Sequence, residues 1–106
     1  MNTPIFTENW SDSNNNPAGG VVFGPGFTIS WQNGPLGRGS ERKEPNGAFV
    51  ENIIKAAATR IEYYQNSKFA CEENAQALDH LNAALWILNN RTKDREARQV
   101  EGTHKE

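Results

Sequence analysis

Two arginines near the C-terminal end of the sequence have the spacing of a phosphate-binding pair. Arg91 and Arg95 are four positions apart, so on a helix they project from the same side. A guanidinium donates two parallel hydrogen bonds to an oxyanion, and two guanidiniums on one side suit a diphosphate or a pair of phosphates. A solvated helix end explains the pair as well, because cations are stabilised at a helix C-terminus. Both interpretations stay open at this point.

Aromatic and amide side chains gather around a predicted turn, at Tyr63, Tyr64 and Asn74. An aromatic face, an amide and guanidiniums could together hold a purine, although Tyr64 also falls on an apolar helix stripe and could belong to a core. Asn74 and Arg91 are about 17 positions apart, which is about 25 Å along a helix. A site that uses both groups must therefore combine residues of different subunits.

The sequence contains no pattern typical of a catalytic or metal site. His80 and His104 are separated by a charged segment, and Cys71 is the single cysteine. His80 could act as a base beside Asp79 or Glu72, and Cys71 at a helix start could form a thiolate. A histidine on the polar face of a helix and a small residue at a helix start are the far commoner explanations. We expect no enzyme, no catalytic residues, no metal and no cofactor.

Composition predicts a small soluble protein. The 106 residues are 36% hydrophobic, include 13 asparagines and carry a formal net charge of −2. No stretch has the apolar length of a membrane span, and no basic residue or apolar run resembling a secretion signal precedes Pro17. A single cysteine fits an intracellular protein. The weakly negative charge argues against binding of DNA or RNA polymers.

The N-terminal third predicts a polar arm followed by strands. Residues 1–20 are rich in Asn and Gly, and we expect a flexible arm there. Apolar residues in 21–32, alternating from Phe27 to Trp31, predict strands that form either a hairpin or a kinked edge. A lone hairpin is marginally stable in water, so a helix or another chain must cover it. Residues 33–45 are predicted to form a mobile loop.

Two amphipathic helices are predicted for the rest of the chain, over 46–65 and 71–90, the second with a basic extension to about residue 98. Asn46 is the expected N-cap of the first helix, and Glu51 lies in its first turns. The first stripe contains Val50, Ile54, Ala57, Ile61 and Tyr64, and the second contains Leu78, Leu81, Leu85 and Leu88. A short turn makes them an antiparallel hairpin, and 99–106 is a predicted tail with a break at Gly102.

The expected fold is therefore α+β, with short N-terminal antiparallel strands and a long helical hairpin in a single domain over 21–106. Two helices cannot enclose a core by themselves. We expect the remaining apolar surface of the helices and strands to be buried by other copies of the chain.

Five segments in this order resemble a known family: Gly26–Gln32, Asn46–Glu51, Arg60–Gln65, Cys71–Asn74 and Asn90–His104. The chain is similar to the Thoeris anti-defence sponges of the first type, which are small phage proteins. Their helical hairpin is shared with the anti-CBASS sponges of the second type. The resemblance covers most of the chain.

The resemblance implies a protein that captures a cyclic nucleotide immune signal without degrading it. In that family the signal is glycocyclic ADP-ribose, made by a TIR-domain enzyme, and cyclic di- and trinucleotides bind at separate sites of a homohexamer. The ADP-ribose site is implied to consist of Tyr64, Asn74, Arg91 and Arg95, with Tyr64 and Arg91 sandwiching the base. Tyr64 stands where a phenylalanine is expected.

The same resemblance implies that the protein acts in the cytoplasm of the infected bacterial host, with no membrane partner. The resemblance does not place the di- and trinucleotide sites, for which Arg38, Arg42 and Arg60 are considered only as available cations. Two other functions stay open: a phosphodiesterase-type enzyme that degrades the same signal, and a helical-hairpin phage protein with a structural or interaction role.

Overall fold

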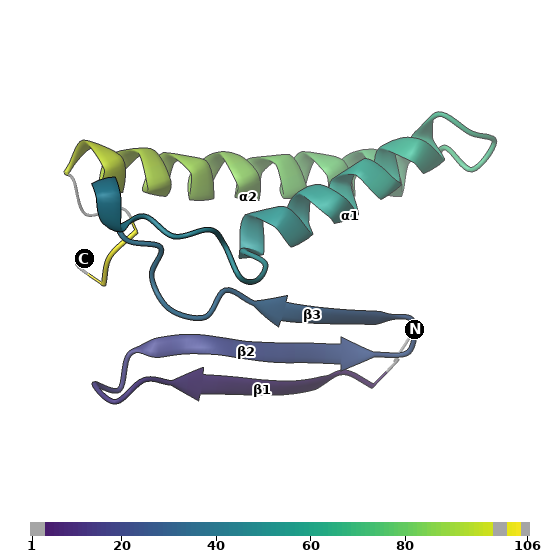
Figure 1. Cartoon of the computed structure of the whole chain (residues 1–106). Coiled ribbons are helices and arrows are strands. Elements are labelled where there is room, and N and C mark those ends of the chain that lie inside the picture. Colours follow the sequence, from purple (N-terminus) through teal and green to yellow (C-terminus); the bar gives the residue numbers. More distant parts are fainter. Residues whose placement is uncertain (1–3, 99–101, 105–106) are drawn as a thin grey trace. The chain divides into compact units, whose positions relative to one another are not determined.

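A three-stranded antiparallel sheet and a pair of helices make up the chain in the computed structural model, which describes residues 4–98 and 102–104. The elements follow the order β1 (Phe6–Ser11), β2 (Pro17–Gly24), β3 (Phe27–Trp31), a 3-10 turn at Gly39–Glu41, α1 (Val50–Gln65) and α2 (Glu72–Ala97) (Figure 1). This arrangement confirms the predicted α+β class and the order of strands and helices. The chain divides into two compact units, Met1–Phe49 with Gln99–Glu106, and Val50–Arg98.

The sheet has the order β1-β2-β3, so β2 lies in the middle. Phe6 of β1 pairs with Phe23 of β2, which pairs with Thr28 of β3. The two phenylalanine rings stack with their centroids 5.4 Å apart. β2 and β3 form the hairpin that was one of the two predicted alternatives. Its turn contains Pro25 and Gly26, and Gly26 has a φ of +87°, the left-handed region that the third position of a type II turn requires.

The expectation of a flexible arm over residues 1–20 is wrong for the described residues from 6 onward, because they form β1, a tight turn and the start of β2. In this turn the Asp12 carboxylate accepts hydrogen bonds from the backbone N–H groups of Asn14 and Asn16, both at 2.9 Å. Asn15 adopts a φ of 63°, which asparagine tolerates better than most residues. The asparagine-rich tract is thus an ordered hairpin turn between strands.

Asn46 is not a helix N-cap, since α1 begins only at Val50. Its side chain instead accepts a hydrogen bond from the Asn33 N–H at 2.8 Å and donates one to the Asn33 carbonyl at 3.1 Å. The Asn46 N–H donates to the Gln32 side-chain oxygen at 2.8 Å. Ala48 then pairs with Trp31 in a parallel bridge. These contacts hold residues 46–48 in an extended conformation along the end of β3, so α1 begins four residues later than predicted.

The loop after β3 is also organised. Leu36 is 7% exposed, and its carbonyl accepts a hydrogen bond from the Lys43 N–H at 2.7 Å. Gly102 has a φ of +80°, as expected for a break, and its carbonyl accepts a hydrogen bond from the Gly37 N–H at 2.7 Å. Of the predicted tail, 99–101 and 105–106 lie outside the described residues.

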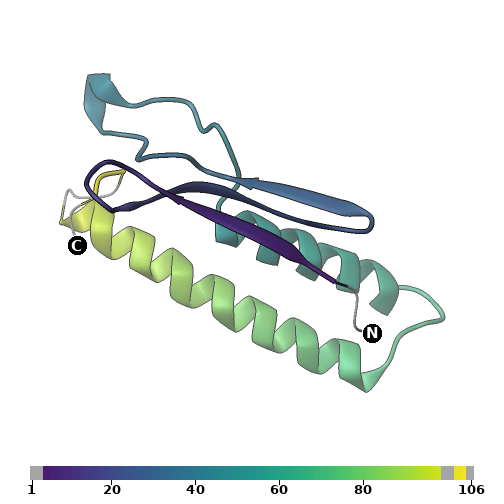
Figure 2. The same cartoon turned by 90° about the horizontal axis from the view of Figure 1, so that it is seen from below.

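In the other unit, α1 and α2 run antiparallel side by side and form the predicted hairpin (Figures 1 and 2). α1 ends at Gln65 as expected, and α2 spans the apolar stretch and its basic extension without interruption. Ala58 of α1 is fully buried, whereas the four leucines of the α2 stripe are only half-buried. Trp86 and Ile87 are exposed, Trp86 to 68%.

Large apolar side chains remain exposed in both units. They are Ile5, Phe6, Trp10, Phe23, Phe27 and Phe49 in the first, and Val50, Tyr63, Tyr64, Phe69, Trp86 and Ile87 in the second. Among the described residues, Leu36 and Ala58 are the buried apolar ones. This is the pattern expected if further copies complete the core, and the oligomer itself remains a prediction. No helix of the described part is both long enough and apolar enough to cross a membrane.

Candidate functional site

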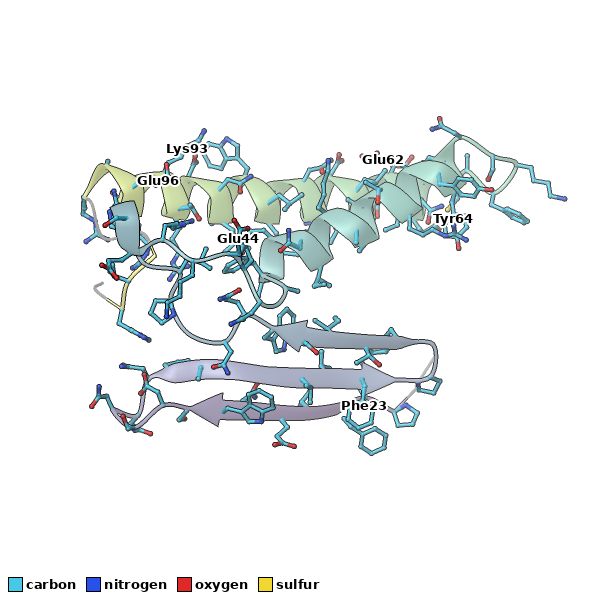
Figure 3. All side chains as sticks on the ribbon, in the orientation of Figure 1. Phe23, Glu44, Glu62, Tyr64, Lys93 and Glu96 are labelled. Carbon is cyan, nitrogen blue, oxygen red and sulfur yellow. The ribbon has the colours of Figure 1, made fainter. Side chains whose placement is uncertain are left out.

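Tyr64 lies in the last turn of α1, at the end of the hairpin where the connecting loop begins (Figure 3). Its carbonyl accepts hydrogen bonds from the Ser67 N–H at 3.0 Å and from the Ser67 hydroxyl at 2.5 Å. The Gln65 side chain bridges the loop, because it accepts from the Cys71 N–H at 2.9 Å and donates to the Cys71 carbonyl at 3.1 Å. The hydrogen bonds between the end of α1 and the loop therefore fix the backbone at Tyr64.

The ring of Tyr64 has a cationic neighbour one helical turn earlier. The Arg60 Nε–H donates a hydrogen bond to the Tyr64 hydroxyl at 3.2 Å. The guanidinium carbon lies 5.0 Å from the Tyr64 ring centroid and 4.9 Å from that of Tyr63. The sequence reasoning did not foresee this cluster. The signal was available in the four-residue spacing of Arg60 and Tyr64.

Asn74 lies in the first turn of α2, at the same end of the hairpin as Tyr64. It is half-buried, and its side-chain N–H donates to the Phe69 carbonyl at 3.4 Å. Because that contact uses the amide nitrogen, the amide oxygen stays directed elsewhere and can accept a hydrogen bond from a ribose hydroxyl or a base edge.

Arg91 and Arg95 lie in the C-terminal part of the same helix. Arg91 is exposed and Arg95 is half-buried in the last turn. Four residues of helix separate them by about 6 Å along the axis, on one side. Next to them the C-cap residue Arg98 forms an ion pair with Asp94 at 3.1 Å, so this cation is engaged at the C-terminal end of α2.

The four predicted ligand residues fall into two groups at opposite ends of the hairpin. Tyr64 and Asn74 are at the loop end, whereas Lys93 and Glu96, which neighbour the arginine pair in sequence, lie at the other end of α2 (Figure 3). Straight helix over about 17 positions separates Asn74 from Arg91 by about 25 Å. A ligand of nucleotide size cannot touch both groups of one chain.

The remaining candidates do not form a reactive cluster in the structure. Cys71 is the N-cap residue of α2 with an exposed thiol, and its side chain makes no capping hydrogen bond. His80 is exposed on α2, and His104 lies 3.8 Å from Asp12 in the other unit. Within residues 4–98 and 102–104, no group of three or more His, Cys, Asp or Glu side chains could hold a metal ion.

Arg38 and Arg42, considered for the other nucleotide sites, both lie in the loop of the sheet unit. The Arg42 guanidinium donates to the Gly37 carbonyl at 3.1 Å. Arg60 belongs to the other unit, where it lies in α1 beside the two tyrosines.

The fold combines a small sheet with a long antiparallel helical hairpin. The hairpin carries aromatic and amide groups at one end and paired arginines at the other. These features place the chain in the class of small α+β hairpin proteins. The chain belongs to the family described as "Acb2/Tad1, hairpin domain", whose profile matches residues 26–93. It is also 46% identical over 77 residues to the protein "Thoeris anti-defense 1" of Bacillus phage SBSphiJ7. That match covers 73% of this chain and 51% of the relative, so the chain spans about half the length of this curated relative.

Proposed function

We propose that this chain is a phage anti-defence protein that binds cyclic nucleotide immune signals and sequesters them without cleavage. The observation that carries the proposal is its 46% identity over 77 residues to "Thoeris anti-defense 1". The hairpin of the chain also presents an aromatic residue, an amide and two arginines. The main ligand is glycocyclic ADP-ribose, and cyclic di- and trinucleotides bind elsewhere on the oligomer. The protein acts in the cytoplasm of the infected host.

The site lies between subunits of a homohexamer. Tyr64 and Asn74 of one copy meet Arg91 and Arg95 of another, because one chain holds these groups about 25 Å apart. Tyr64 and Arg91 stack on the two faces of the adenine, each contact contributing about 1–3 kcal/mol. Arg95 neutralises the diphosphate, and Asn74 accepts a hydrogen bond from a ribose or base edge.

Effective capture requires tight binding. Nanomolar affinity corresponds to about −12 kcal/mol, so stacking, charge neutralisation and exclusion of water by the neighbouring subunit must act together. No proton transfer or bond cleavage is part of this mechanism. The protein therefore acts in stoichiometric amounts.

A release experiment separates capture from degradation. The protein is mixed with a slight molar deficit of glycocyclic ADP-ribose, the free signal is measured after filtration, and the sample is then denatured by heat and measured again. We expect the free signal to disappear before heating and to return intact afterwards. Loss of the signal after heating would identify a phosphodiesterase-type enzyme instead.

The Tyr64→Ala/Arg91→Ala double variant serves as the matched control and should leave the signal free throughout. Titration of the wild-type protein with short DNA should show no heat of binding. If DNA binds and the cyclic nucleotides do not, the chain is a structural or interaction protein.

A further inference from the structure

The tyrosine pair at the end of α1 is held by one side chain. Arg60 donates from Nε to the Tyr64 hydroxyl at 3.2 Å, and its guanidinium carbon lies about equally far from both tyrosine ring centroids, at 4.9 and 5.0 Å. The rings of Tyr63 and Tyr64 meet edge to face with their centroids 6.0 Å apart. The three side chains thus form a compact cluster.

Packing alone does little to fix these rings. Tyr63 is 62% exposed and Tyr64 is 37% exposed. An exposed aromatic side chain samples several rotamers. When a ligand stacks on it, one rotamer is selected, and the lost conformational entropy weakens binding. A hydrogen bond to the hydroxyl, together with a cation over the ring, restricts Tyr64 before the ligand arrives.

We propose that Arg60 is a positioning residue for Tyr64, holding its ring in the orientation that stacks on the purine of the signal. This inference rests on the proposed function and names the residue that prepares the stacking surface. Arg60 holds Tyr64 through the tyrosine hydroxyl, because a phenylalanine at this position would offer Arg60 no hydrogen-bond acceptor. Arg60 acts through Tyr64 and does not itself contact the ligand.

The test measures the affinity for glycocyclic ADP-ribose by titration calorimetry in four proteins: wild type, Arg60→Gln, Tyr64→Phe and the double variant. We expect Arg60→Gln to weaken binding about threefold to tenfold, the range that one net hydrogen bond of this kind contributes. In the Tyr64→Phe background the same change should have a clearly smaller effect, because the hydrogen bond is already absent.

Lys55→Gln is the matched control, since it removes one positive charge from an exposed position of the same helix. It should bind like the wild type. A second readout needs no ligand: in NMR spectra of the free protein, the Arg60 Nε–H should show contacts to the Tyr64 ring, and these should be lost in Tyr64→Phe.

Each outcome has its own meaning. If the wild type binds the signal and Arg60→Gln binds equally well, the positioning role is wrong and the proposed function stands. If Arg60→Gln weakens binding by the same factor in both backgrounds, the hydrogen bond to the Tyr64 hydroxyl does not carry the effect, and the positioning role through that hydroxyl is wrong. If the wild type does not bind the signal, the proposed function fails and the role of Arg60 fails with it.

Discussion

Two of the residues proposed to bind the ligand, Tyr64 and Asn74, are held by short-range contacts. Tyr64 is fixed through its carbonyl by Ser67 and through its hydroxyl by Arg60. Asn74 is fixed by its hydrogen bond to the Phe69 carbonyl. The tyrosine hydroxyl, which the resemblance to the sponge family left without a role, has its partner inside the same helix.

Single substitutions at the stacking residues should abolish tight binding and leave the fold intact. Tyr64→Ala and Arg91→Ala should each weaken binding of glycocyclic ADP-ribose about tenfold to a hundredfold, because each removes one stacking contact from the base. Titration calorimetry measures the affinity, and circular dichroism verifies the helices.

Lys93→Ala is the matched control for Arg91→Ala. Lys93 lies two positions further along α2, and residues two apart do not share a helix face. Its removal should leave the affinity unchanged. If Arg91→Ala and Lys93→Ala weaken binding equally, general charge attraction and not stacking holds the ligand.

The Asp12 turn should respond to acid. Hydrogen bonds from the backbone N–H groups of Asn16 and Asn14, with the side chain of Asn16 and the charge of His104, lower the pKa of Asp12 below its ordinary value. A carboxyl with a lowered pKa in the folded state stabilises that state above its ordinary pKa, and this contribution is lost as pH falls through the folded-state pKa.

We expect the backbone amide resonances of Asn14 and Asn16 to titrate together in an NMR pH series, with a midpoint below that of an ordinary aspartate. In Asp12→Asn the side-chain oxygen still accepts these hydrogen bonds but does not titrate, so the two resonances should stay constant over the same range. A wild-type midpoint above the ordinary aspartate value would contradict the structure.

At the scale of elements, the segment that connects β3 to α1 depends most on contacts between residues far apart in the sequence. Residues 46–48 lie along the end of β3, where the Ala48 N–H donates to the Ser30 carbonyl at 2.7 Å and its carbonyl accepts from the Gln32 N–H at 2.9 Å. Gly47 lies so close to Trp31 that a β-carbon would come within 2.5 Å of the Trp31 carbonyl group. The junction therefore requires glycine at this position.

Gly47→Ala should destabilise the sheet unit by about 1–3 kcal/mol, because the backbone must shift and break the bridge between Trp31 and Ala48. Thermal unfolding followed by circular dichroism measures the loss. Gly26→Asn is the control, since Gly26 also has special backbone geometry but open space around it, and asparagine accepts a positive φ. Equal losses in both variants would contradict the close contact.

At the scale of the whole molecule, large apolar side chains are exposed in both units of the chain. The two groups of residues that we propose to bind the ligand are also too far apart to act within one copy. Both facts have the same explanation if copies associate so that the loop end of one hairpin meets the arginine end of another.

A complementation experiment tests this arrangement. Tyr64→Ala and Arg91→Ala should each lack sites of wild-type affinity. When they are co-expressed in one oligomer, about a quarter of the shared sites should receive an intact Tyr64 from one copy and an intact Arg91 from another, and these should bind like the wild type. Differently tagged chains allow the mixed oligomers to be purified, and calorimetry counts the sites.

The two variants mixed after separate purification, without subunit exchange, are the control and should still lack sites of wild-type affinity. If the co-expressed oligomers also lack such sites, then each site lies within one chain or the residue assignment is wrong. Native mass spectrometry on the same samples gives the number of subunits.

The sequence alone predicted the helical hairpin closely. The spacing of the leucines in the second helix and of the isoleucines in the first is a local signal, and α1 ends at Gln65 as expected. The hairpin of β2 and β3 was one of two predicted alternatives, because a run of apolar residues precedes a Pro-Gly turn and alternating apolar residues follow it. The placement of Tyr64, Asn74, Arg91 and Arg95 along these helices followed from the same periodicity.

Only the tertiary structure decided the features that depend on pairing between distant residues. β1 has few large apolar side chains, and it is a strand because its backbone pairs with β2. Asn46 was expected to cap a helix, yet Asn33, 13 positions earlier, binds its side chain. Local sequence patterns encode helix periodicity well, whereas backbone pairing and side-chain partners across a loop are selected by the folded chain as a whole.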